Sequence, residues 1–151
     1  MRAIVQRVAR AEVRTEGRTL GKIGPGLVIL LGVGRGDTEA DADYIVDRVI
    51  GLRVFADAAG KMNLALAAVG GALLVVSQFT LHADVSQRRP SFTGAAPPDE
   101  ASRLYEYLLS RVRVHGVSVE SGEFGAEMEL ELVNDGPVTI ILDSHSRSQE
   151  R

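Results

Sequence analysis

Turn-forming residues divide most of this chain into short strand-like segments, and only two stretches have the periodicity of an amphipathic helix. Some strand-like segments are almost continuously apolar, such as 72–76 and, apart from Gly32, 27–33, whereas glutamates alternate with apolar residues over 127–132. Alternation of this kind is typical of a strand with one buried face. Because strands outnumber helices and several are joined by tight turns, we expect an α+β fold: a curved antiparallel or mixed sheet, or a β-barrel, with two helices packed outside.

Both helix predictions depend on capping residues as well as on periodicity. The first helix follows Asp37 and Thr38, which are favourable N-cap residues, and ends near Gly51. The second begins at Pro98, which suits the first helical position, and acidic residues follow it. Its predicted core stripe consists of Ala101, Leu104, Tyr105, Leu108 and Val112.

Length and composition limit the classes of function. The 151 residues fit one domain, which we place at 1–143 with a polar C-terminal tail at 144–151. The absence of cysteine excludes disulfides, thiol nucleophiles and cysteine-based zinc sites. No apolar run approaches the ~20 residues of a membrane span, so we expect a cytoplasmic protein with no membrane partner. A net charge of −3 argues against broad nucleic-acid binding and favours a local contact.

Two short polar segments are the strongest candidates for a functional site. Ser77-Gln78-Phe79-Thr80-Leu81 closes the buried run 72–76, and Asn134-Asp135-Gly136-Pro137-Val138-Thr139 interrupts an alternating strand. Gly-Pro commonly marks a turn, and X-Pro is the bond at which a cis peptide costs least. We expect both segments at strand ends, where backbone N–H and C=O groups are exposed. They indicate a site built largely from backbone atoms, for a small polar substrate.

Two other motifs favour ordinary structural roles. Gly32-Val33-Gly34-Arg35-Gly36-Asp37 resembles a dinucleotide-binding turn, but an aspartate takes the place of the third glycine and would repel a pyrophosphate. A glycine-rich turn with an Asp cap is the better interpretation. His82, His115 and His145 are too far apart in sequence to form a recognisable metal site. His82 alone is near a candidate site, and a solvated loop histidine is the favoured interpretation.

A basic and aromatic segment, Arg88-Arg89-Pro90-Ser91-Phe92, lies in the long loop before the second helix. Such a segment can contact phosphates and stack on a base. An ordinary surface loop explains it equally well, and the sequence leaves both interpretations open.

Together, these segments resemble the D-tyrosyl-tRNA deacylase type of D-aminoacyl-tRNA deacylase. The resemblance rests on six segments that occur in family order over nearly the whole length. They are Ala3-Ile4-Val5-Gln6-Arg7-Val8, Leu30-Leu31-Gly32-Val33, Gly60-Lys61-Met62-Asn63, Val75-Val76-Ser77-Gln78-Phe79-Thr80-Leu81, Arg89-Pro90-Ser91-Phe92 and Leu132-Val133-Asn134-Asp135-Gly136-Pro137-Val138-Thr139. Two departures are a missing glycine in the loop 84–88 and a longer polar tail.

The resemblance implies a compact β-rich fold, a homodimer, and hydrolysis of the ester that joins a D-amino acid to the 3′ end of tRNA. It also implies that the Gly136-Pro137 peptide is cis and enters the partner subunit's site. No metal and no organic cofactor are implied.

The matched segments then take specific roles. The residues expected to take part in catalysis are Ser77, Gln78, Phe79 and Thr80. The backbone N–H groups of Phe79 and Thr80 are the expected oxyanion donors. Chiral selection and substrate binding are expected from Gly136, Pro137, Phe124 and Met62. The expected contacts to tRNA are Arg88 and Arg89. Because glycine has no side chain to exclude, we also expect glycyl-tRNA to be cleaved and L-aminoacyl-tRNA to be rejected.

The nucleophile has more than one possible source. Thr80 needs an adjacent base to attack directly, and only His82 is near in sequence. A water oriented by the 2′-hydroxyl of the terminal adenosine needs no such base, and we favour it. Two alternatives stay open: an ester hydrolase that uses Thr80 or Ser77 with His82, and a non-catalytic module that binds RNA ends.

Overall fold

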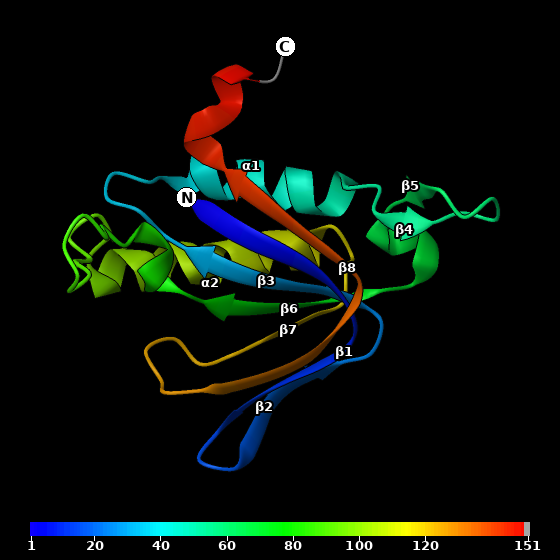
Figure 1. Cartoon of the computed structure of the whole chain (residues 1–151), viewed down its shortest axis with the longest axis horizontal. Helices are drawn as coiled ribbons and strands as arrows, with labels where there is room; N and C mark the ends of the chain where they lie inside the picture. Colours follow the sequence, from blue (N-terminus) through cyan, green and yellow to red (C-terminus); the bar gives the residue numbers. More distant parts are fainter. Residues whose placement is uncertain (150–151) are drawn as a thin grey trace.

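The structure is a computed structural model in which residues 1–149 are described (Figure 1). The strands are β1 (Arg2–Thr15), β2 (Arg18–Ile23), β3 (Gly26–Gly32), β4 (Phe55–Ala56), β5 (Met62–Leu64), β6 (Ala72–Ser77), β7 (Val119–Ser121) and β8 (Glu129–Asp143). The α-helices are α1 (Glu39–Gly51) and α2 (Pro98–Val114), and the short 3₁₀ helices are η1 (Leu66–Val69), η2 (Phe79–His82) and η3 (Ser144–Gln149).

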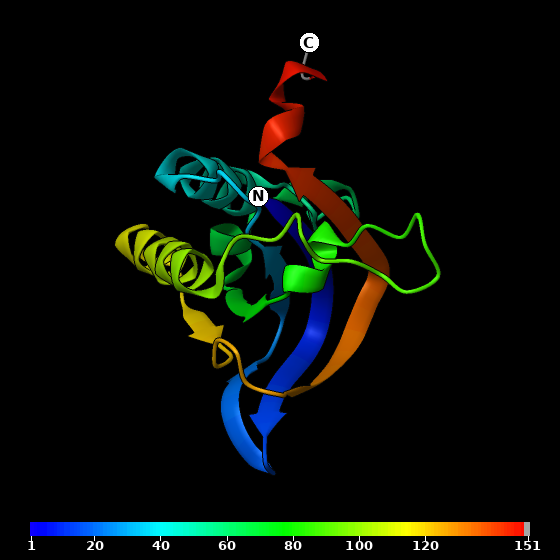
Figure 2. The ribbon, with the colours of Figure 1, turned by 90° about the vertical axis from the view of Figure 1, so that its left-hand side faces the viewer.

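The main sheet is mixed and strongly curved. Its strand order is β2-β1-β3-β6-β7, and β8 pairs with the free side of β1. β1 runs antiparallel to β2, β3 and β8, whereas β3–β6 and β6–β7 are parallel pairs. Figures 1 and 2 show the sheet bending toward a nearly closed barrel, with both α-helices on one side. The predicted α+β fold is confirmed.

β1 contributes to two hydrophobic cores because its pairing with β8 shifts register between Gln6 and Arg10. Before these irregularities, Ala3 and Val5 face the helices; after them, Ala11 and Val13 lie inside the barrel with the apolar residues of β2 and β6. All four positions are odd-numbered, so the irregularities together turn the side chains to the other face of the sheet. One long strand therefore joins the helix-covered layer to the barrel interior.

The two helices cover the sheet as their apolar stripes predict. Residues Ala101, Leu104, Tyr105, Leu108 and Val112 of α2 are all buried. The Tyr105 hydroxyl donates a 2.9 Å hydrogen bond to the carbonyl of Val75, and burial raises the pKa of Tyr105 to about 12. Thr38 is the N-cap of α1, and its N–H donates to the Asp41 carboxylate at 2.8 Å.

Two sequence-based expectations differ from the structure. Gly136 and Pro137 do not end a strand, because β8 continues through them to Asp143. β8 pairs with one strand, β1, so its other edge tolerates a residue without an N–H group. The tail also begins later than expected: Ser144 is 3% exposed and accepts a hydrogen bond from the N-terminus. Residues 150–151 of the predicted tail lie outside the described part of the chain.

Candidate functional site

A cavity of about 530 Å³ opens at the carboxyl ends of the parallel strands β3 and β6. Open α/β sheets commonly place ligands at this edge. The lining is mostly apolar and comes from β3, the end of β6, the 92–98 segment, α2 and the 124–125 turn. It includes Leu31, Val33, Phe79, Phe92, Ala96, Tyr105 and Phe124.

The first polar segment forms the polar wall of this cavity. Ser77 ends β6, and the N–H of Gln78 donates a 2.7 Å hydrogen bond to the carbonyl of Leu31 on β3. The chain then turns into η2. Within residues 1–149, the N–H groups of Phe79 and Thr80 donate to no backbone carbonyl outside this turn. Two adjacent amide donors are therefore available beside the cavity.

Side-chain contacts fix the shape of the η2 turn. The Gln78 amide donates a short hydrogen bond to Oγ1 of Thr80. The ring of Phe79 is 56% exposed and meets the Phe92 ring edge-on, with ring centroids 5.2 Å apart. Phe79 therefore lies at the mouth of the cavity and not in its interior.

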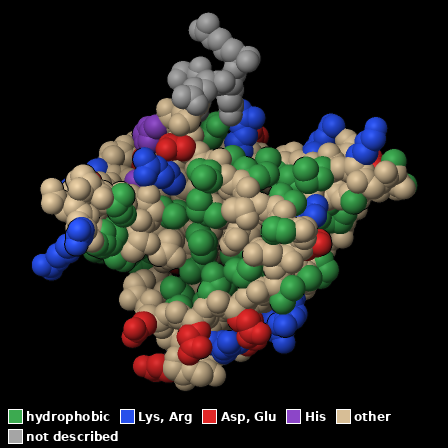
Figure 3. All heavy atoms as spheres, viewed as in Figure 1, with side chains coloured by type: hydrophobic (Ala, Val, Ile, Leu, Met, Phe, Trp, Pro, Cys, Tyr) green, Lys and Arg blue, Asp and Glu red, His purple; other side chains and the backbone are tan. Residues whose placement is uncertain are grey.

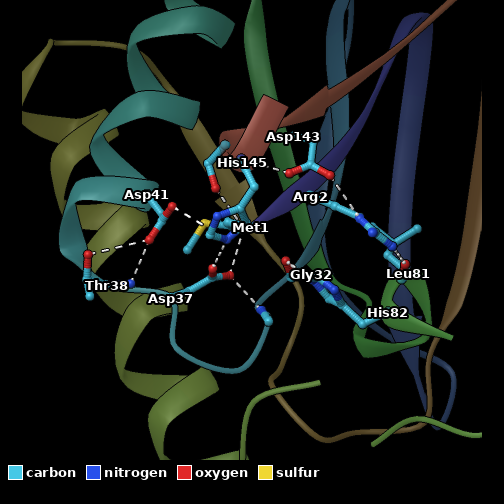
Figure 4. A network of polar contacts seen from close by, with 12 residues as sticks. Met1, Arg2, Gly32, Asp37, Thr38, Asp41, Leu81, His82, Asp143 and His145 are labelled. Carbon is cyan, nitrogen blue, oxygen red and sulfur yellow. Dashed lines mark hydrogen bonds and ion pairs between the residues drawn. The ribbon is translucent and has the colours of Figure 1, made fainter. Parts of the chain in front are cut away.

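His82 is held away from the polar segment. Its Nε2 lies 3.0 Å from the carbonyl oxygen of Gly32, to which the ring donates (Figure 4). A Cβ atom at Gly34 would lie 2.9 Å from Cε1 of this ring, so glycine permits the close approach. His82 is thus a half-buried side chain packed on β3, not the solvated histidine that the sequence favoured.

Of the other two residues predicted to bind the substrate, one lines the cavity and one does not. Phe124 lines the cavity together with Ser77, Gln78 and Phe79. Met62 is exposed on β5, outside the cavity lining. Phe92 of the basic and aromatic segment also lines the cavity. Further lining residues, for which the sequence predicted no role in the site, are Arg35, Ala95, Ala96, Pro97, Pro98, Ala101 and Tyr105. Ala101 and Tyr105 belong to the apolar stripe of α2. Their spacing predicts burial in the core, so the sequence gives no separate sign that they also line a cavity.

The predicted tRNA contacts and the Gly-Pro pair lie elsewhere on the surface. Arg88 and Arg89 are exposed in the loop between η2 and α2, and within residues 1–149 neither forms an ion pair. Gly136 and Pro137 are exposed on β8 and do not line this cavity. Their peptide bond is cis. Arg7 holds the segment, donating from Nε to the Asp135 carbonyl at 3.0 Å.

One group of side chains has the composition of a metal site. Ligand atoms of Asp37, Asp41 and His145 lie within 4.8 Å of one another. The α-ammonium of Met1 already lies 2.7 Å from Asp37, so a cation of the protein itself neutralises this carboxylate (Figure 4). Burial raises the pKa of Asp41, but hydrogen bonds from Ser144 and Thr38 and the charge of the ammonium group outweigh it, and the pKa is lowered.

Comparisons with known proteins agree over nearly the whole chain. The family model for D-Tyr-tRNA(Tyr) deacylase matches residues 4–143, which include both polar segments. A D-aminoacyl-tRNA deacylase of Dehalococcoides mccartyi (strain ATCC BAA-2266 / KCTC 15142 / 195) is 57% identical, with 100% of this chain and 99% of the relative covered. One from Anaeromyxobacter dehalogenans (strain 2CP-C) is 58% identical, with 95% and 97% covered.

Two solved structures are also similar. A c-Myc DNA unwinding element binding protein has a TM-score of 0.89 and 37% identity, and the match covers 95% of this chain and 98% of that one. A probable eukaryotic D-amino acid tRNA deacylase has a TM-score of 0.80 at 18% identity, with 93% and 97% covered. The second likeness supports the fold alone.

Proposed function

We infer the function from one premise: the chain belongs to the D-Tyr-tRNA(Tyr) deacylase family. It is a hydrolase, a D-aminoacyl-tRNA deacylase. We propose that it acts in the cytoplasm as a proofreading enzyme that releases the D-amino acid and free tRNA. The observation that carries the finer mechanism is the pair of amide donors at Phe79 and Thr80 beside an apolar cavity. No helix of the described residues is long and apolar enough to cross a membrane.

The two amide groups would stabilise the oxyanion that forms when water attacks the ester carbonyl. An oxyanion donor of this kind typically contributes ~2.7–4 kcal/mol to transition-state stabilisation. Two hydrogen bonds would keep the donors in place before substrate binds. The side-chain amide of Gln78 donates to Thr80, and the backbone N–H of Gln78 donates to the carbonyl of Leu31 on β3. Catalysis would then require positioned backbone more than a reactive side chain.

The nucleophile in this proposal is water oriented by the 2′-hydroxyl of the terminal adenosine. Direct attack by Thr80 would need a base, and within residues 1–149 no hydrogen bond joins Thr80 or Ser77 to His82, whose ring packs against Gly32 and Gly34. Holding the reacting groups in a productive orientation alone can supply ~7–11 kcal/mol. The same observation argues against a Ser77–His82 pair.

The apolar cavity suits the terminal base of the tRNA. Bases of single-stranded RNA ends commonly stack on aromatic side chains, and Phe92, Tyr105 and Phe124 contribute rings to this lining. With the base seated there, the ester would lie at the mouth, beside Phe79. Arg88 and Arg89 are exposed in the adjacent loop and would contact the tRNA phosphates.

Chiral selection would come from Gly136 and Pro137 of a second copy, because these residues lie outside the cavity of their own protomer. Backbone carbonyl oxygens would hold the α-ammonium group of the substrate. With the ammonium and the ester both fixed, an L side chain would collide with backbone, whereas a D side chain points away. Glycyl-tRNA would escape this exclusion and be cleaved.

The outer face of the sheet supports pairing with a second copy. Ile141 of β8 is 71% exposed and lies opposite Ile4 of β1, which pairs in turn with Leu30 of β3. Figure 3 shows hydrophobic side chains gathered across this face. Exposed apolar patches of this kind commonly mark protein interfaces. Pro137 and Thr139 are also exposed, at the alternate positions before Ile141, so a copy bound there would meet the Gly-Pro segment.

A deacylation assay with matched D-tyrosyl-, L-tyrosyl- and glycyl-tRNA tests the proposal. We expect rapid release from the D and glycyl substrates and a rate on the L substrate no higher than that of spontaneous hydrolysis. Equal rates on D and L substrates would refute the stereochemical mechanism. Tight binding of tRNA with no ester turnover would instead favour a module that binds RNA ends through Arg88 and Arg89.

A further inference from the structure

The α-ammonium group of Met1 is buried inside the fold (Figure 4). Its nitrogen lies 2.7 Å from Oδ2 of Asp37, and both side chains are 0% exposed. The same nitrogen donates to Oγ of Ser144 at 2.8 Å, and the N–H of Ser144 donates back to the carbonyl of Met1 at 2.9 Å. The amino end of β1 is thereby fixed to the residue that follows β8.

The carboxylate of Asp37 also binds the loop between β3 and α1. Its Oδ2 accepts a 2.6 Å hydrogen bond from the N–H of Gly34, and its Oδ1 lies 2.7 Å from Nε2 of His145. A buried carboxylate is stable only when it is paired and hydrogen-bonded. The ammonium group supplies the pairing charge, and the Gly34 amide fixes the loop to the same carboxylate.

This loop is a wall of the candidate site. Val33 and Arg35 line the cavity, and Asp37 lies two residues beyond Arg35. The N–H of Arg35 donates to the carbonyl of Gly94 at 3.0 Å, and the N–H of Ala96 donates to the carbonyl of Val33 at 3.0 Å. The loop therefore also positions the segment that forms the opposite part of the lining. A displacement of Asp37 would therefore also shift the cavity lining, because these hydrogen bonds join the loop to the 94–96 segment.

Acylation of the α-amino group would remove its positive charge and part of its donor capacity. Asp37 would then be a buried carboxylate without its ammonium partner, and breaking one side of a buried ion pair is strongly destabilising. An added residue before Met1 would have a similar effect, because the ammonium would be displaced from a site with no exposed surface.

We propose that the α-amino group of Met1 is a modification site that controls the cavity. In a chain that begins at Met1, the free ammonium holds Asp37 and the 33–37 wall, and an N-terminal formyl or acetyl group releases them. Deacylase activity then requires a free N-terminus. The activity part of this inference rests on the proposed function, whereas the structural part does not.

The test compares chains that differ only at the N-terminus. A cleavable amino-terminal fusion is cut to leave either free Met1 or one glycine before Met1, and a third sample carries N-formyl-Met1, verified by intact mass. Each is made in the natural sequence and with Asp37→Asn. In the natural sequence we expect the extension or the formyl group to lower Tm by about 10 °C. With Asp37→Asn, the same modifications should lower Tm by less than half as much.

Amide hydrogen exchange separates a loosened wall from a general loss of stability. We expect modification to speed exchange at Arg35 and Ala96 by at least about tenfold, while amides of the β1–β2 hairpin near Thr19, which open locally without breaking the Met1–Asp37 pair, change little. The kcat for D-tyrosyl-tRNA should fall in parallel. Equal Tm losses with and without Asp37→Asn, or exchange raised uniformly, would overturn the inference. If the free Met1 chain itself lacks deacylase activity, the proposed function fails, and melting and exchange still decide the structural part.

Discussion

Replacing Thr80 by alanine separates the two possible nucleophiles. Oγ1 of Thr80 accepts a hydrogen bond from Gln78, and within residues 1–149 no hydrogen bond joins it to His82, so no histidine base is in place beside the hydroxyl. If the hydroxyl only positions Gln78, its removal costs about one hydrogen bond, ~0.5–1.5 kcal/mol. That range corresponds to a decrease of about two- to thirteenfold in the rate of the chemical step.

Single-turnover hydrolysis of D-tyrosyl-tRNA with enzyme in excess measures this step directly. Thr80→Ser, which keeps the hydroxyl, is the matched control and should remain close to the natural enzyme. A nucleophilic Thr80 would instead leave Thr80→Ala with a loss of about a thousandfold or more, as removal of covalent nucleophiles commonly does. A loss of that size in folded Thr80→Ala, or an acyl-enzyme trapped on Thr80, would refute the argument that positioned backbone and the 2′-hydroxyl perform the catalysis.

Other perturbations test the fold and the interface. Tyr105→Phe removes the buried hydrogen bond to Val75 and should lower stability by ~1 kcal/mol, seen as a Tm decrease of about 2–4 °C; an unchanged Tm would show that this bond contributes nothing. Ile141→Lys places a charge on the exposed apolar face and should convert a dimer to monomers in sedimentation velocity, whereas persistence of the dimer would place the interface elsewhere. Stability should also be lost in acid. Burial raises the pKa of Asp143, but hydrogen bonds from His145 and Arg2 outweigh it, and the pKa is lowered. A carboxyl with a lowered folded-state pKa stabilises the protein above its unfolded value, and this stabilisation disappears as pH falls below 3.8 and through the folded-state value. Urea titrations should show this acid loss, and it should be smaller in Asp143→Asn; an identical acid loss in both chains would contradict the assignment.

Local patterns were sufficient to predict the helices and most strands. The start of α2 at Pro98 and its buried stripe follow from capping preferences and helical spacing, which act within a few residues. The position of Ser77 at the end of β6 follows from the apolar run that precedes it. The family resemblance added what these patterns do not contain, namely the link between two polar segments far apart in sequence.

Features that depend on distant partners were not predictable in the same way. Gly136-Pro137 has the local signature of a strand end, yet β8 pairs with β1 on both sides of it, at Asn134 and at Thr139. Ser144 and His145 look like a polar tail, and their contacts with Met1 and Asp37 arise only when the chain ends meet. Asp37 looked like a cap, and its N-terminal ion pair has no short-range signal. Met62 matched a family motif, but it lies outside the cavity lining.

Complementation between two inactive variants tests most directly whether Gly136-Pro137 of one copy completes the site of another. Ala101→Phe fills the cavity, and Gly136→Ala adds a Cβ 2.9 Å from Arg7 where φ is +120°. Each variant alone should hydrolyse D-tyrosyl-tRNA poorly while remaining folded and dimeric. Random mixing makes half of the dimers mixed, with one intact site of two, so about a quarter of the natural activity should return, selective for D over L. A mixture no more active than its components would contradict a site shared between copies.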